Sequence, residues 1–283
     1  SVRRIYRHAE LLRKDFILLG TNGRGAMLHS PVAWGNLASR YDALLAANLN
    51  PHHPDDRRVM FSRCRAWVVF QGFSQALNTD CLEMFRLGAG SSGIWEYHIP
   101  TGQGEHVFLT ICVEMVTGEN SMHMVFIRDS AKNRQGMLAD HEAGRLILRP
   151  DIESRNFHET TKAFQGPEHL WPGAVKSNPD GFTFVPEQEH RLKLKISDGT
   201  FVWEPEWQYM VHRPIEAERG LDADSDLFSP GYFSSFLKGG ASVTLSASIR
   251  SSRVPNQKSR VREFEPEIFE KNGSCPPDEA LTT

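Results

Sequence analysis

The residues best suited to chemistry lie between Trp207 and Gly231, where carboxylates and arginines are interleaved. They are Glu216, Glu218, Asp222, Asp224 and Asp226, with Arg213 and Arg219. Hydrolysis of a glycosidic bond generally needs two carboxyl groups, one of which an apolar environment keeps protonated. No apolar neighbour distinguishes one carboxylate as an acid here, so the stretch predicts no catalytic residue. The preferred interpretation is an ion-paired loop at a strand crossing, with Arg219 as a buried partner; the second is contact with a ligand or another domain.

Aromatic residues offer a second kind of chemistry, because an aromatic ring can stack on the apolar C–H face of a sugar. Most tryptophans of the chain are expected in the core. Trp171, in the loop-like segment Leu170–Gly173, and Trp207 are the candidates for sugar stacking. His158 with Glu159 is the best histidine–carboxylate pair, but neighbours on a strand face opposite sides, so an ordinary surface pair is the simpler hypothesis.

The sequence predicts no metal site and no cofactor. The four cysteines, Cys64, Cys81, Cys112 and Cys275, are far apart and form no Cys-x-x-Cys pair. The glycines of Thr21–Gly25 belong to no phosphate-binding motif, since G-x-x-x-x-G-K-S/T is absent and no helix is expected to follow. This segment is instead predicted to be a tight connection between strands with positive backbone angles at its glycines.

These candidates are separated by segments with the two-residue period of β-strands. Long strand-like runs span Arg40–Asn48 and Arg57–Phe70. Hairpins are expected to pair His106–Val116 with Ser121–Arg128, Arg191–Ile196 with Thr200–Trp203, and Tyr232–Leu237 with Ser242–Ile249. Because strands with one apolar face need a second layer to cover it, the pattern predicts an all-β fold, a large two-sheet antiparallel sandwich.

The charged stretch also carries a family resemblance. Glu216–Asp222 reads E-x-E-R-G-x-D, Asp226–Gly231 reads D-L-x-x-P-G, and Thr21–Gly25 reads T-N-G-x-G. In this order the segments resemble the amino-terminal domain of bacterial and archaeal-type glycogen debranching enzymes, the amylo-α-1,6-glucosidases. Arg40–Leu45 is similar to the family's R-x-Y-H-G-L-L, except that Asp42-Ala43 replaces its His-Gly pair.

The resemblance covers roughly Leu18–Ile249 and implies a non-catalytic β-sandwich that contributes to glucan binding and docks a helical catalytic domain of the same protein. The residues implied in contact with a carbohydrate or with that domain are Asn22, Arg24, Tyr41, Trp171, Trp207, Glu218, Arg219 and Asp226. The expected partners are therefore a glucan or oligosaccharide and the catalytic domain. Because both signatures are rich in glycine, arginine or carboxylate, they are expected to converge on one edge of the sandwich.

Composition divides the chain into a β-sandwich domain, residues 1–249, and a linker or tail toward the helical domain, residues 250–283. Basic and acidic blocks cancel in that tail and prolines close it. The net charge of −3, with 24% charged residues, lacks the basic excess of a protein that binds nucleic acid or an anionic membrane. No apolar run approaches a bilayer span and the first residues do not read as a secretory signal, so a cytoplasmic protein is expected.

Two other classes of function stay open. The first is a free-standing sandwich enzyme that acts on sugars, similar in architecture to aldose epimerases. It would need a histidine and a carboxylate in one cleft, and His158 is its candidate. The second is a structural or protein-interaction module without a carbohydrate role. The order of the motifs favours the debranching-enzyme domain over both.

Overall fold

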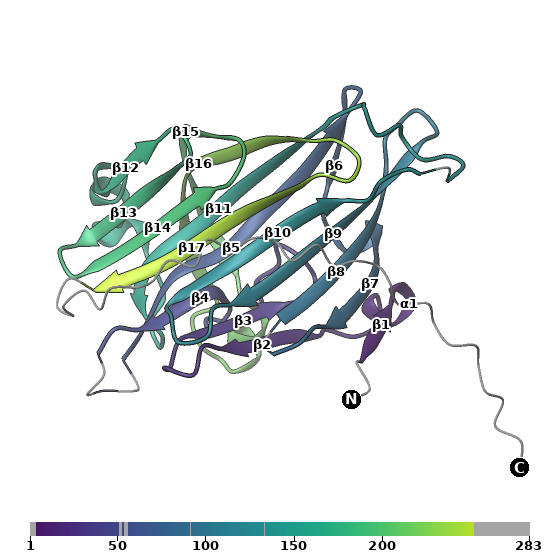
Figure 1. Ribbon diagram of the computed structural model, residues 1–283. Coiled ribbons are helices and arrows are strands. Elements are labelled where there is room, and N and C mark those ends of the chain that lie inside the picture. The colour runs from purple at the N-terminus through teal and green to yellow at the C-terminus, as the bar shows by residue number, and fades with distance from the viewer. Residues whose placement is uncertain (1–3, 51–52, 54–55, 91, 133, 252–283) are drawn as a thin grey trace, which may run out of the picture. The chain divides into compact units, whose positions relative to one another are not determined.

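The computed structural model describes residues 4–50, 53, 56–90, 92–132 and 134–251, and Figure 1 shows that strands dominate this part of the chain. The strands are β1 (Ile5–Arg7), β2 (Ile17–Thr21), β3 (Met27–Pro31), β4 (Ala43–Asn48), β5 (Arg57–Phe70), β6 (Phe73–Ala76), β7 (Leu82–Leu87), β8 (Ser92–Pro100), β9 (His106–Met115), β10 (Ser121–Arg128), β11 (Gly144–Asn156), β12 (Val175–Asn178), β13 (Gly181–Glu187), β14 (His190–Ile196), β15 (Thr200–His212), β16 (Asp224–Leu237) and β17 (Ser242–Ser251). The short helical segments are α1 (His8–Leu11), η1 (Thr79–Cys81), η2 (Ala163–Gln165), α2 (Pro167–Leu170), η3 (Pro172–Ala174) and α3 (Pro214–Glu218).

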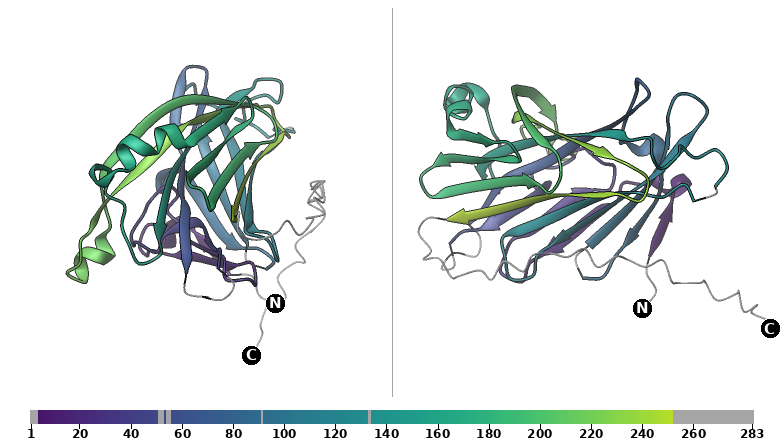
Figure 2. Two further views of the ribbon diagram at one scale, coloured as in Figure 1. Left: turned by 90° about the vertical axis from the view of Figure 1, so that its left-hand side faces the viewer. Right: turned by 45° about the horizontal axis from the view of Figure 1, so that its top comes forward.

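The strands form two antiparallel sheets, which confirms the predicted all-β, two-sheet sandwich. Sheet A has nine strands in the order β1-β7-β8-β9-β10-β17-β14-β13-β12. Sheet B has eight, in the order β15-β16-β11-β5-β4-β3-β2, with β6 paired to β5. The two views of Figure 2 show the sheets as curved layers that face each other.

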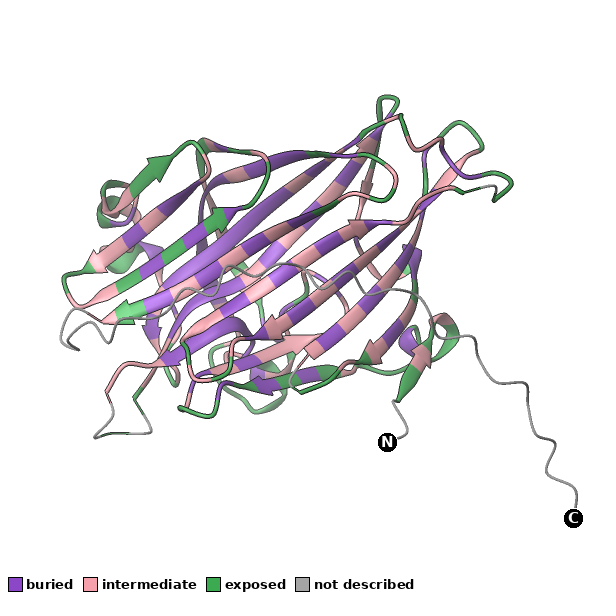
Figure 3. Cartoon of the chain, in the orientation of Figure 1, coloured by how far each residue is buried: buried purple, intermediate pink, exposed green. Residues whose placement is uncertain are grey.

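Apolar side chains fill the space between the sheets. Buried and half-exposed residues alternate along β9 and β10, as the banding in Figure 3 shows. The predicted hairpin is confirmed, with Val125 opposite Cys112. At the centre, the fully buried Trp95 meets Trp34 edge-on at 5.2 Å between ring centroids, and its indole N–H donates to the Val32 carbonyl oxygen.

The other two expected hairpins are wrong, although their segments are strands. β14 pairs with β13 and β17 in sheet A, whereas β15 pairs with β16 in sheet B. Likewise β16 and β17 follow each other along the chain but lie in different sheets. The two-residue period shows which face of a strand is apolar but not which strand lies beside it. A chain that crosses between the sheets keeps its apolar residues in the core just as a hairpin does.

The described part of the chain ends with β17, whose last residue is Ser251, two residues beyond the expected end of the sandwich. The rest of the predicted tail, residues 252–283, lies outside the described residues. Among the helices described, none is both long and apolar enough to cross a membrane.

Gly231, the last residue of the D-L-x-x-P-G segment, lies where β15 and β16 approach closely. A Cβ atom at this position would lie 2.0 Å from the backbone oxygen of Val202. A backbone atom cannot move away as a flexible side chain can, so the strands would have to separate. The signature glycine is therefore explained by packing.

We predict that Gly231→Ala lowers the free energy of unfolding by about 1–3 kcal/mol, the typical cost of overpacking a closely packed position. Gly173→Ala is the matched control, since a Cβ there meets nothing within 4 Å. Denaturant unfolding of both variants measures the difference. Equal midpoints for the two variants would contradict this explanation.

Candidate functional site

The charged stretch begins in β15 and ends in β16 of sheet B, and α3 with a short loop connects the two strands. Pro214 occupies the first turn of α3, where its missing N–H is not needed. The N–H of Ile215 donates to the Ala38 carbonyl oxygen at 3.0 Å, which ties the helix to the segment before β4. Gly220 has a φ of 69° and ends the helix, as glycines after helices commonly do.

Glu216 is the buried anchor of this helix. Its carboxylate accepts hydrogen bonds from the Ser39 hydroxyl at 2.8 Å and from the Arg40 backbone N–H at 3.0 Å. It also pairs with the Arg40 guanidinium through Nε and Nη2, both at 3.0 Å. Burial alone would raise the pKa of Glu216, but these hydrogen bonds and the Arg40 charge outweigh it and lower the pKa.

Glu153, on β11, is a second fully buried carboxylate. Thr161 and Arg155 donate to one of its oxygens at 2.8 and 2.9 Å, and the Ser62 hydroxyl donates to the other. Burial opposes ionisation, yet the positive charges of Arg155 and Arg213, together with the Ser62 hydrogen bond, lower the pKa of Glu153.

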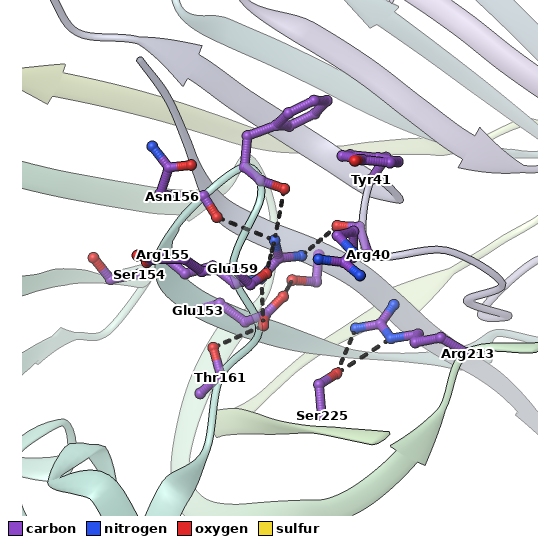
Figure 4. Close-up of polar contacts among 12 residues, drawn as sticks. Arg40, Tyr41, Glu153, Ser154, Arg155, Asn156, Glu159, Thr161, Arg213 and Ser225 are labelled. Carbon is purple, nitrogen blue, oxygen red and sulfur yellow. Dashed lines mark hydrogen bonds and ion pairs between the residues drawn. The ribbon is translucent and has the colours of Figure 1, made fainter. Parts of the chain in front are cut away.

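Arg213 has its guanidinium enclosed just before α3, with 1% of the residue exposed. It donates to the Ser225 hydroxyl through Nε and Nη2 and to the Ser39 carbonyl oxygen through Nη1. Its pKa is lowered by burial, while the Glu153 carboxylate favours the charged form. These residues, with Arg155, form the carboxylate–arginine network (Arg40, Glu153, Arg155, Arg213, Glu216), part of which Figure 4 shows.

The network stabilises structure and does not equip the protein for acid–base catalysis. Its carboxylates are held ionised and each carboxylate oxygen already accepts a hydrogen bond, whereas a general acid needs a raised pKa and access to substrate. The loop is ion-paired, as the sequence predicts. Among the described residues, no group of three or more histidine, cysteine, aspartate or glutamate side chains could hold a metal ion.

Arg219 differs from the prediction of a buried ion-pair partner. Its side chain is 52% exposed and lies 3.9 Å from the Glu216 carboxylate, a distance at the limit of an ion pair. Its guanidinium lies 6.0 Å from the centre of the Tyr41 ring instead. The tight pairing with Glu216 belongs to Arg40, because Arg40 extends from the turn on which α3 packs.

The other carboxylates of the stretch have separate tasks. Asp226 is buried and accepts from the backbone N–H groups of Ala163 at 2.7 Å and Met210 at 2.9 Å. Asp222 pairs with Lys162 at 2.7 Å.

Glu218 is exposed and lines a hollow of about 430 Å³ beside α3. Sequence reasoning missed this hollow, since Lys14, Arg63, His212 and its other lining residues come from distant segments.

The Thr21–Gly25 turn makes its contacts elsewhere. Asn22 is 2% exposed, and its side chain donates to the Glu119 carbonyl oxygen and to the Asn120 side chain across the sandwich. Its own side-chain oxygen accepts from the backbone N–H groups of Arg24 and Ala26. Asn22 thus joins the two sheets, while the Arg24 side chain is exposed.

The two signature segments are joined by a row of side chains rather than by direct contact. Arg57 donates to the Gly25 carbonyl oxygen at 3.0 Å and lies over the Phe157 ring. Phe157 packs on Tyr41 at 4.6 Å between ring centroids. This arginine–aromatic row (Arg57, Phe157, Tyr41, Arg219) is half-buried in its middle and exposed at Arg219. No hydrogen bond described for Asn22 or Arg24 reaches the α3 loop.

His158 is exposed at the side of this row. Its ring nitrogen lies 3.4 Å from the Tyr41 hydroxyl, and its carbonyl oxygen accepts from Arg40. The contacts described for His158 include no carboxylate, and Arg40, which donates to its carbonyl oxygen, pairs with Glu216. His158 is therefore not the histidine of such a pair; the histidine–carboxylate pairs in this part of the described structure are His29 with Asp42 at 2.8 Å and His212 with Asp224 at 3.0 Å.

The predicted sugar-stacking tryptophans lie between α2 and η3, in the case of Trp171, and on β15, in the case of Trp207. Trp171 is only 6% exposed and contacts Phe184 of sheet A, so it is a core residue in the described structure. Trp207 is half-buried and stacks on Trp171 at 5.6 Å. The most exposed ring of this stack is Tyr209. Sequence reasoning did not select it, because the sequence does not show which of several aromatic residues is exposed in the folded protein.

The fold and this polar loop define a class of protein: a large antiparallel sandwich that carries a buried carboxylate–arginine network. Residues 18–244 match the family model described as "Glycogen debranching enzyme N terminal", and the chain belongs to that family. No curated protein sequence matches the chain.

Two solved structures have a similar arrangement of the backbone. One is described as "Putative kojibiose phosphorylase from human microbiome", with 8% identity over 90% of this chain and a TM-score of 0.43. The other is a bacterial glucoamylase complexed with acarbose, with 10% identity over 89% of this chain and a TM-score of 0.41. This chain matches 33% and 36% of those chains, about a third of each.

We predict that Arg213→Ala destabilises the protein by about 3–5 kcal/mol, because it removes one of the two positive charges that compensate the buried Glu153 carboxylate and leaves buried hydrogen-bond acceptors unpaired. Arg219→Ala is the matched control and should cost less than about 1 kcal/mol, since its side chain is half exposed and its ion pair is long. Thermal and denaturant unfolding compare the two variants. A greater loss in Arg219→Ala would show that the network has been assigned to the wrong arginine.

Proposed function

We propose that this chain is the non-catalytic amino-terminal sandwich of a glycogen debranching enzyme, which docks a helical catalytic domain of the same protein and contributes to glucan binding. The observation that carries the proposal is the arginine–aromatic row, which lies between the two family signatures and keeps Arg219 exposed. Domain interfaces are more polar than a core, and arginine and tyrosine are enriched in them. The role implies a cytoplasmic enzyme of glycogen breakdown, with residues 250–283 leading toward the catalytic domain.

The buried network supports a docking role over a catalytic one. It fixes the backbone on both sides of the row, through Arg40 next to Tyr41 and through Glu216 in the helix before Arg219. A surface that is already ordered before contact loses little conformational entropy on docking. Rigid side chains between two fixed segments are therefore suited to hold a second domain in one orientation.

We predict that residues 1–283 release no glucose from a branched limit dextrin. The reason is that the network carboxylates are ionised and enclosed, so no carboxyl group there can protonate a glycosidic oxygen. A coupled glucose assay over a range of pH measures the release. Turnover that Glu153→Gln or Glu216→Gln abolishes in a folded protein would overturn the non-catalytic assignment.

We also predict that Arg219→Ala weakens docking in the protein that contains both domains. The isolated sandwich should keep its unfolding temperature, because Arg219 is half exposed. In the two-domain protein the sandwich should unfold at a lower temperature than in the unaltered protein, since arginine is enriched among the interface residues whose truncation costs about 2 kcal/mol or more. Calorimetry of both forms measures the difference.

The control for docking is Lys195→Ala, whose side chain is 57% exposed on the outer face of β14. It should leave both forms unchanged. If Arg219→Ala has no effect in the two-domain protein, the row is not the docking surface, and a structural module without this interface becomes the better description.

A further inference from the structure

A series of three stacked aromatic rings leads from the core to the surface where β15 lies beside α2. Trp171 and Trp207 are separated by 5.6 Å with planes 22° apart, and Trp207 and Tyr209 by 6.2 Å with planes 19° apart. The exposed fraction rises along the series from 6% at Trp171 to 54% at Tyr209. The last ring therefore has another ring beside it and is about half exposed to solvent.

The position of Tyr209 is fixed by a hydrogen bond of its hydroxyl and by a hydrogen bond of the backbone that follows it. Its hydroxyl donates to the Glu168 carboxylate on α2. The next residue, Met210, has a φ of 53°, which is unusual for a residue other than glycine. The buried Asp226 carboxylate accepts from the Met210 N–H and from the Ala163 N–H, and so holds β15 against the segment before α2.

Strained backbone held by its surroundings occurs often at binding sites, and here it coincides with unusual exposure of apolar side chains. The three most exposed large hydrophobic residues of the described chain are Phe164 at 75%, Met210 at 72% and Leu170 at 68%. All three belong to the two segments that the Asp226 carboxylate and the Tyr209–Glu168 hydrogen bond join. We call this group, with Tyr209 and Glu168, the tyrosine platform.

The chemistry of the tyrosine platform fits a neutral sugar chain. A pyranose has an apolar C–H face that packs on an aromatic ring, and it has hydroxyl groups around its edge. Glu168 uses one carboxylate oxygen for Tyr209, and the other oxygen can accept from a sugar hydroxyl. A carboxylate beside the ring repels an anionic ligand, and a membrane surface would favour lysine or arginine at this position.

We propose that the tyrosine platform is a surface binding site for a gluco-oligosaccharide, with Tyr209 as the stacking residue and Glu168 as a hydrogen-bond acceptor. This inference rests on the proposed function for the identity of the sugar. It differs from the docking surface, because none of the platform residues belongs to the arginine–aromatic row. The platform would retain a glucan chain on the sandwich.

Titration of residues 1–283 with maltoheptaose tests the site. Tryptophan fluorescence reports binding, because Trp207 lies directly behind Tyr209, and calorimetry gives the dissociation constant. Tyr209→Ala should weaken binding about tenfold or more, in the range expected for loss of an aromatic stacking partner. Tyr209→Phe keeps the ring but loses the contact with Glu168, so it should weaken binding less.

Phe236→Ala is the control, because this aromatic side chain is 65% exposed on β16 and lies outside the platform. Its affinity should equal that of the unaltered chain, and thermal unfolding should show that each variant is folded.

The proposal would be overturned if the unaltered chain did not bind maltoheptaose at millimolar concentration, or if Tyr209→Ala bound it as tightly as the unaltered chain. Concentration-dependent dimerisation that Tyr209→Ala abolishes would also overturn it, in favour of self-association. The docking experiment with Arg219→Ala has an independent outcome, so failure of one proposal is distinguishable from failure of the other.

Discussion

The burial of two ionised carboxylates beside sheet B is the constraint on which the order of the surrounding loops depends. Glu153 and Glu216 are fully buried, and an uncompensated buried carboxylate is very costly. The segments that supply their partners must therefore stay in place, namely the turn with Ser39 and Arg40, the Thr161 segment and the residues around Arg213. Three connections that would otherwise be mobile surface loops become fixed parts of the sandwich. This explains why Arg213 and Glu216 of the charged stretch are buried.

Buried polar side chains also connect other pairs of segments. Asp226 accepts backbone N–H groups from two segments, and Asn22 bonds to its own turn and to the hairpin of the opposite sheet. A short polar side chain with all its hydrogen-bonding atoms used holds two backbones at a defined distance at little cost in side-chain entropy. Gly231 acts in the opposite way, since it lets two strands approach by having no side chain. Together these residues account for much of the family signature without assigning any of them to catalysis.

The exposed side chains around these anchors divide into two surfaces. The arginine–aromatic row ends at Arg219, beside α3, and has the composition of an interface between domains. The tyrosine platform lies where β15 meets α2, and its ring and carboxylate have the composition of a sugar site. Asp226 belongs to the charged stretch but supports the tyrosine platform, whereas Glu216 supports the row. One stretch of sequence therefore orders both surfaces, which would let a sandwich domain hold a catalytic domain and a glucan at the same time.

The sequence by itself determined the all-β sandwich, the strands β4, β5, β9, β10, β14 and β17, parts of β15 and β16, the hairpin of β9 and β10, and the ion-paired nature of the loop. These follow from local patterns, since side-chain alternation and turn residues act within a few positions of the chain. Only the tertiary structure decided that β14 and β15 lie in different sheets, because both arrangements bury the same apolar faces. It also decided that Arg40 and Arg213 rather than Arg219 enter the network, and that Tyr209 rather than Trp171 is exposed. Burial and ion pairing depend on which distant segments pack together, here the turn before β4 on α3 and Trp171 on Trp207 of β15. No local pattern of one sequence carries that information.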